Sequence, residues 1–187
     1  HNSAAYGYLY RYNGDNWSVE KPRNNGGLTL FDIYGFSNED IWVVGDGGTW
    51  KHDHWTREEG ILHYNGYKWN RIDIPEGRVI LDLAPISRDN IWGCGYLGMI
   101  YHYDGNNWSI IDTVETNSNN TYSFYTIVAT NDKIYITGSN LYNNSINSTI
   151  YLIKGDGKSF SIIDSVELVQ GEQPTEWANR LFKDKKG

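Results

Sequence analysis

One stretch of the chain, residues 46–60, gathers side chains whose types and spacing could bind a ligand. His52, Asp53 and His54 offer two imidazoles and a carboxylate, which are groups that hold transition metals. Alternate residues share a face only on an extended chain, and no third ligand follows at a spacing typical of metal sites. We therefore predict no bound metal. Trp50 and Trp55 lie beside the histidines and could stack on a sugar or a protein.

Candidate contact residues follow from this stretch and from one neighbouring turn. Tyr67 adds a third ring outside the stretch. The set that we predict to contact a ligand or partner is Trp50, His52, His54, Trp55 and Tyr67. The alternative is a hairpin extension that binds nothing.

Catalysis would need other groups. A glycosidase requires two carboxyl groups that converge on one bond, whereas Glu58 and Glu59 are adjacent and point apart. An acidic substrate would need clustered arginines, but those of this chain share no position in the repeat described below: Arg11, Arg23, Arg57, Arg71, Arg78, Arg88 and Arg180. We predict no catalytic residues and no cofactor.

Composition favours many short strands. The chain has 187 residues, 8 Trp, 15 Tyr and 20 Gly, a balance typical of aromatic strands joined by tight turns. A net charge of −7 without a basic cluster argues against nucleic acid as a partner. No apolar run reaches the roughly 20 residues that span a bilayer. The single cysteine, Cys94, is expected to be a buried, inert thiol.

A repeated unit must position these side chains. Its first half reads SNEDIWVVG at residues 37–45, SRDNIWGCG at 87–95 and TNDKIYITG at 130–138. Its second half is an Asx-Gly turn followed by an aromatic residue, and it recurs four times at intervals of 52, 39 and 52 residues. The copies are residues 12–17, 64–69, 103–108 and 155–160. Apolar runs at 28–36, 80–86 and 122–129 precede the first half and predict buried strands.

Four strands in every 40 to 50 residues is the spacing of a β-propeller blade. We predict an all-β chain with a half blade at residues 1–27 and whole blades at 28–77, 78–116 and 117–165. The recurring aromatics are expected to pack between blades: Trp42, Trp92 and Tyr135, and Trp17, Trp69, Trp108 and Phe160. The residues two before each turn are expected to contact a turn carboxylate or a backbone carbonyl: Arg11, His63, His102 and Lys154.

The last residues, 166–187, leave the repeat. Thr175 could cap a short helix, on which Trp177, Leu181 and Phe182 form an apolar stripe. Three and a half blades do not close a ring, because closed propellers use about four to eight. We therefore expect these three residues to be buried at a contact with a protein partner, with the rest of a longer chain or with further copies of this chain.

The two halves of the unit together, S-x-x-[DN]-I-W-x-x-G and H-Y-[DN]-G-x-x-W, resemble a repeat of bacterial exported β-propellers over residues 6–165. The turn is also similar to the Asp-box of sialidase-like propellers, although GDGGTW at residues 45–50 is one residue short of that pattern. The resemblance implies a propeller outside the cell, at its surface or in the periplasm. We expect a non-catalytic binding or structural module; a sialidase-like glycoside hydrolase or a carbohydrate-binding propeller is the alternative.

Overall fold

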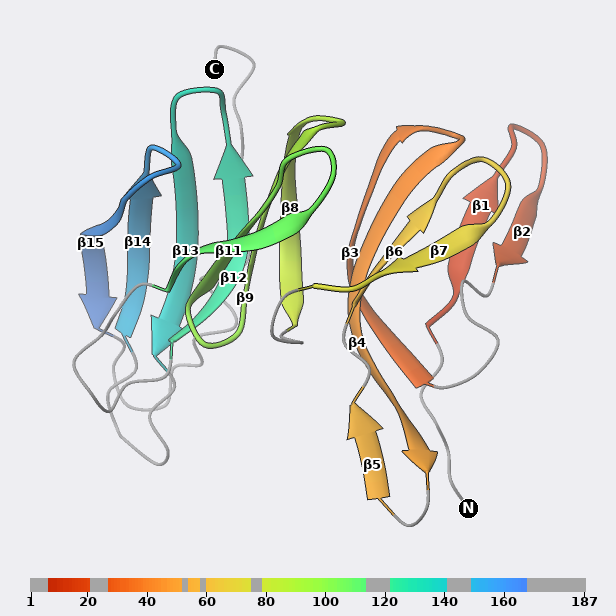
Figure 1. Ribbon diagram of the computed structural model, residues 1–187, viewed down its shortest axis with the longest axis horizontal. Helices are drawn as coiled ribbons and strands as arrows, with labels where there is room; N and C mark the ends of the chain where they lie inside the picture. The colour runs from red at the N-terminus through yellow and green to blue at the C-terminus, as the bar shows by residue number, and fades with distance from the viewer. Residues whose placement is uncertain are drawn as a thin grey trace. The chain divides into compact units, whose positions relative to one another are not determined.

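The computed structural model describes residues 7–20, 27–51, 54–57, 60–74, 79–113, 122–140 and 149–167. Every regular element in these ranges is a β-strand, so the all-β prediction is confirmed (Figure 1). None of these elements is a helix able to cross a bilayer. The predicted terminal helix, with Trp177, Leu181 and Phe182, lies outside the described residues.

The chain divides into two compact units, residues 1–79 and 80–187. Unit 1 holds β1 (Leu9–Tyr12), β2 (Trp17–Glu20), β3 (Gly27–Ser37), β4 (Asp40–Lys51), β5 (His54–Arg57), β6 (Gly60–Tyr64) and β7 (Trp69–Ile72). Unit 2 holds β8 (Ile80–Ser87), β9 (Asn90–Gly95), β10 (Met99–Tyr103), β11 (Trp108–Thr113), β12 (Tyr122–Ala129), β13 (Ile134–Asn140), β14 (Thr149–Gly155) and β15 (Phe160–Glu167).

The strands pair with their sequence neighbours in antiparallel sheets. Unit 1 has the two-stranded sheet β1-β2 and a sheet in the order β3-β4-β6-β7, to which β5 adds by pairing with β4. Unit 2 has the four-stranded sheets β8-β9-β10-β11 and β12-β13-β14-β15. All of these sheets are open, and the propeller remains a prediction. The repeated sequence unit thus gives a repeated four-stranded meander.

The core of unit 2 lies between its two sheets. Ile100 from β10, Phe124 from β12 and Ile153 from β14 are all 0% exposed and belong to one apolar cluster. Asp82 joins the same two sheets, because its Oδ2 accepts hydrogen bonds from Thr126 Oγ1 at 2.9 Å and from the Ile127 amide at 2.7 Å. Cys94 is buried in this core, as expected.

In unit 1 the β1-β2 sheet packs on its neighbour. Leu9 lies against a small cluster that includes Leu62 and Trp69. The Trp69 indole Nε1 donates to Glu20 Oε2 at 3.3 Å. The Arg11 guanidinium lies over the Tyr64 ring, 4.9 Å from its centre, so one face of β1-β2 is covered.

Three of the seven recurring aromatics are buried, as predicted. Trp42, Trp92 and Trp108 are 3%, 6% and 5% exposed, and the others are half-buried except for one. Trp17 is 68% exposed, so the prediction for this residue is wrong. It lies on the face of β1-β2 that points away from the neighbouring sheet, and no described residue covers that face.

Candidate functional site

The stretch at residues 46–60 forms a projecting hairpin. β4 continues past its pairing with β6, which ends at Gly45, and its last residues pair with β5. In that register Trp50 lies opposite Trp55, and Lys51 lies opposite His54. His52 lies outside the described residues. The two predicted tryptophans therefore share one rung of a ladder that extends beyond the other strands of its sheet (Figure 1).

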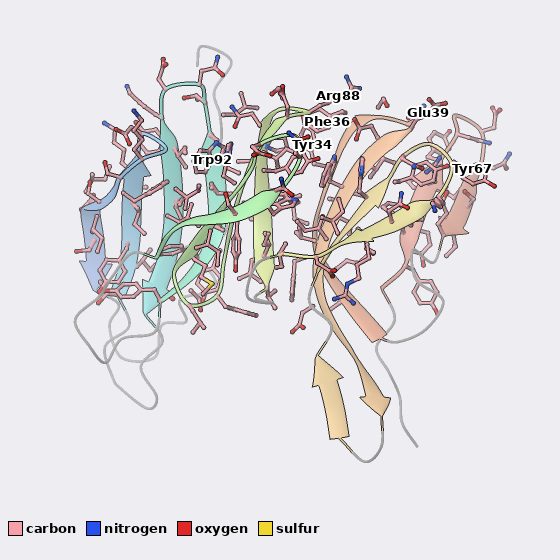
Figure 2. The ribbon with its side chains drawn as sticks, in the orientation of Figure 1. Tyr34, Phe36, Glu39, Tyr67, Arg88 and Trp92 are labelled. Atoms are coloured by element: carbon pink, nitrogen blue, oxygen red, sulfur yellow. The ribbon has the colours of Figure 1, made fainter. Side chains whose placement is uncertain are left out.

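Tyr67, the remaining candidate contact residue, lies at the other end of the same sheet. It belongs to the β6-β7 turn and is 87% exposed. Glu39, in the β3-β4 turn, lies at this end too, where its side chain approaches Gly66 (Figure 2). The structure therefore brings Trp50 and Trp55 together and separates Tyr67 from them.

A histidine cluster in unit 1 occupies this turn end of the sheet. The His63 ring stacks on Trp42 with ring centres 4.1 Å apart. Asp40 Oδ1 lies 2.9 Å from His63 Nε2 and accepts the Trp42 indole N–H at 3.1 Å. Since a carboxylate oxygen accepts hydrogen bonds, this contact is one that a proton on His63 Nε2 would complete. A turn carboxylate or a backbone carbonyl was expected as the partner of His63; the partner is instead Asp40, the first residue of β4.

A second histidine cluster occurs in unit 2. His102 packs on Trp92 with ring centres 4.3 Å apart, and its Nε2 lies 2.9 Å from Asn90 Oδ1. An amide thus stands where unit 1 has Asp40. Burial lowers the pKa of His102, while the carboxylate of Asp104 in the next turn acts in the opposite direction. His102 is therefore held in an environment that favours the neutral ring.

A pocket of about 260 Å³ opens beside this cluster, between the two sheets of unit 2. Trp92 is shown in Figure 2 among the strands of this unit. The pocket lining combines cationic, anionic, neutral polar and apolar side chains: Ile86, Asn90, Trp92, His102, Thr130, Asn131, Asp132, Lys133, Ile134, Asp156, Gly157 and Lys158. Such a mixture suits a small polar ligand better than an apolar one.

The third repeat departs from the other two. Lys133 stands in the place of Asp40 and Asn90, and Tyr135 in the place of the tryptophans. Lys154 lies opposite Tyr135 in the ladder, as His63 lies opposite Trp42. The histidine cluster is therefore a property of two of the three repeats.

The four Asx-Gly turns share one geometry. In each turn the Asx Oδ1 accepts the amides two and three residues later, at 2.8–3.2 Å. Each glycine has φ between 86° and 106°, which explains its recurrence. These amides lower the pKa of the two carboxylates in this position, Asp104 and Asp156. The two asparagines, Asn13 and Asn65, make the same bonds without a charge.

Neither a metal site nor a similar protein indicates what this chain binds. Within the described ranges, no three His, Cys, Asp or Glu side chains come together as metal ligands. Neither a protein-family model nor a curated protein sequence matches this chain.

One surface was missed by the sequence analysis. Tyr10, Tyr12, Trp17 and Val19 are all more than half exposed and lie on one face of the β1-β2 sheet. The alternation of Tyr8, Tyr10 and Tyr12 was the available signal, because alternate strand residues share a face. The repeat pattern pointed to burial instead.

Proposed function

We propose that this chain consists of β-propeller blades and acts as a non-catalytic binding module outside the cell. The four-stranded meanders, β8-β9-β10-β11 and β12-β13-β14-β15, support the blade assignment. Their packing around one apolar cluster supports it further, because neighbouring blades bury a shared core. The resemblance to exported repeats supports the location.

The difference between the two ends of the sheets carries the binding proposal. One end is built from turns of nearly constant geometry, and in unit 2 some of these turn residues also line the pocket beside His102. The opposite end bears the β4-β5 hairpin, whereas the same position in the next repeat is the short connection Tyr96-Leu97-Gly98. Variable loops on a constant scaffold are typical of binding surfaces. We assign ligand or partner contact to the hairpin, with Trp50 and Trp55 as its contact residues.

One observation that bears on the non-catalytic assignment is the pKa of three exposed turn carboxylates. A general acid in glycoside hydrolysis needs a raised pKa. Asp89, Asp104 and Asp156 instead have lowered pKa values, caused first by the Ser87 hydroxyl for Asp89 and by turn amides for the other two. These groups are acceptors that stabilise turns.

The test is a loop exchange within the chain. Residues 46–59 are replaced by the Tyr-Leu-Gly connection of residues 96–98, which the repeat shows to be compatible with the flanking strands. Wild-type protein, this exchange, Trp50→Ala/Trp55→Ala and the control Tyr67→Ala are compared on an array of neutral and acidic oligosaccharides and on intact bacterial cells. Binding by the wild type and Tyr67→Ala, with loss in the other two, is expected.

Two results would overturn the proposal. Unchanged binding by the loop exchange would remove the hairpin from the contact surface. Turnover of aryl glycosides or sialosides by the wild type would instead favour the glycoside hydrolase alternative. Far-ultraviolet circular dichroism of each variant checks that the β-structure is retained.

A further inference from the structure

The exposed face of the β1-β2 sheet is a contiguous aromatic surface. Tyr10, Tyr12, Trp17 and Val19 are 66%, 54%, 68% and 54% exposed. Tyr10 pairs with Val19 and Tyr12 with Trp17, so the four side chains occupy two alternate rungs, which share one face. The Tyr12 and Trp17 rings lie 5.1 Å apart. Soluble proteins rarely leave such a patch without a partner.

Unit 1 shows what covers an equivalent face. Leu62, Tyr64 and Trp69 occupy in the β6-β7 pair the positions that Tyr10, Tyr12 and Trp17 occupy in β1-β2. They are covered by three residues from the other face of β1-β2, namely Leu9, Arg11 and Glu20. The covering set supplies an apolar contact, a cation over the tyrosine ring and a carboxylate for the indole N–H.

The β12-β15 sheet presents the same covering set. Lys154 pairs with Ser161, as Arg11 pairs with Ser18. Leu152 pairs with Asp164, as Leu9 pairs with Glu20, although a register shift between Leu152 and Ile153 adds one residue to β15 that β2 lacks. Because Ile153 is buried in the core of unit 2, alternation places Leu152 and Lys154 on the opposite face. Lys154 forms no ion pair within the described part of the chain.

We propose that a second copy of this chain docks the Leu152, Lys154 and Asp164 face of its β12-β15 sheet on the aromatic face of β1-β2. The Lys154 ammonium then lies over the Tyr12 ring, a cation–π contact like that of Arg11 with Tyr64. The Asp164 carboxylate accepts the Trp17 indole N–H, as Glu20 accepts that of Trp69. The two faces differ, so the association is head-to-tail and gives a ring or an open chain of copies.

Sedimentation and light scattering test this association. The mass of the wild type is expected to rise with concentration above that of a monomer. Trp17→Glu blocks the aromatic face, and Lys154→Glu/Asp164→Lys blocks the sheet face. Each change is expected to raise the Kd by at least about thirtyfold, as for a central tryptophan or a reversed charge pair in an interface. Tyr67→Ala and Lys68→Glu, at an exposed turn outside both faces, are matched controls that leave the mass unchanged.

A mixing experiment separates this mechanism from misfolding. Each blocked variant keeps one intact face, so the two variants are expected to be monomers alone and a one-to-one dimer when mixed. Tyr12→Ser is a second, milder variant of the aromatic face and is expected to combine with the sheet-face variant in the same way. A wild type that stays monomeric at every concentration, or blocked variants that do not combine, would overturn the proposal. If the contact were instead between two identical faces, the mixture of the two variants would be no heavier than the variants alone. That result would also overturn the proposal.

Discussion

The histidine clusters of the two units place their carboxylates differently. In unit 1 the carboxylate Asp40 contacts His63 directly, and the following turn carries the neutral Asn65. In unit 2 the neutral Asn90 contacts His102, and the following turn carries the carboxylate Asp104. Each histidine thus has one acidic neighbour, but the charge has moved from the contact position to the turn.

This difference shows which parts of the cluster depend on charge. The stacking of histidine on tryptophan is similar in both units, with ring centres 4.1 Å and 4.3 Å apart. An amide oxygen and a carboxylate oxygen both lie 2.9 Å from the histidine Nε2. Packing therefore fixes the geometry of both clusters, whichever of the two acceptors is present.

The largest expected effect comes from removing the packing that the two clusters share. Trp92→Ala should lower the free energy of unfolding by about 3–5 kcal/mol, because a buried aromatic ring is lost and a cavity remains. Trp42→Ala should cost about the same amount. Denaturant unfolding followed by circular dichroism measures both changes.

The third repeat supplies the control for this prediction. In the third repeat, Tyr135 takes the place of Trp92, so Trp92→Tyr introduces the side chain that this repeat already has. It should cost clearly less than Trp92→Ala, since most of the ring is kept. Equal losses for the two variants would show that the indole itself, rather than its packing, holds the cluster.

The second effect concerns the acceptor beside each histidine. Asp40 accepts from two side chains, whereas Asn90 contacts His102. Asp40→Ala should cost about 1–3 kcal/mol, because two part-buried donors lose this acceptor, and Asn90→Ala should cost about 1 kcal/mol. Asp40→Asn keeps an acceptor and serves as the control in the same unfolding assay. A larger loss for Asn90→Ala than for Asp40→Ala would contradict the comparison.

Much of the strand order could be predicted from the repeats. The apolar runs at residues 80–86 and 122–129 fall within β8 and β12, whose residues are buried or half-buried. The run at 28–36 falls within β3, where Phe31, Ile33 and Tyr34 are 40%, 53% and 38% exposed, so its predicted burial is wrong. The hairpin turns were predicted from Asx-Gly pairs, whose glycines need positive φ. Local sequence determines such features.

The histidine partners and the exposed aromatic face could not be predicted in the same way. Asp40 meets His63 only through the register between β4 and β6, which pairs Trp42 with His63. The exposure of Trp17 depends on what packs against β1-β2, and its sequence matches that of the buried Trp108 repeat. Both features depend on contacts between strands or sheets that the repeat alone does not specify.

Changing the position of the carboxylate near His102 should change the pKa of this histidine. The change tests the comparison of the two histidine clusters without a large effect on stability. Asn90→Asp places a carboxylate at the contact position and should raise the pKa of His102. Asp104→Asn removes the carboxylate that favours the charged ring and should lower it further. NMR titration of the His102 ring protons measures both. Shifts in the same direction for the two variants would contradict the role given to charge.

The sign of the pH effect on stability follows from the wild-type pKa. Since the folded chain holds the pKa of His102 below the ordinary 6.5, the unfolded chain takes up a proton that the folded chain does not. Unit 2 should therefore lose stability as the pH falls below 6.5. Asn90→Asp should reduce this loss, because it raises the folded-state pKa. Unfolding midpoints measured across this range test the sign.

The smallest expected effect is in the turns, where unit 2 has carboxylates and unit 1 has amides. The pKa of Asp104 is held below 3.8, first by the Asn107 amide and then by the Asn106 amide. Its contribution to stability is therefore present above 3.8 and is lost as the pH falls through the lower folded-state value. Asp104→Asn should make the β10-β11 hairpin insensitive to this acid range, and Asn65→Asp should make the β6-β7 hairpin sensitive to it.

Because both side chains are exposed, we expect a small change in amide exchange at the two turns, measured by NMR between neutral and acidic pH. An acid response that is unchanged in both variants would show that the turn carboxylates and amides are equivalent, and that only the carboxylate in contact with the histidine distinguishes the two units.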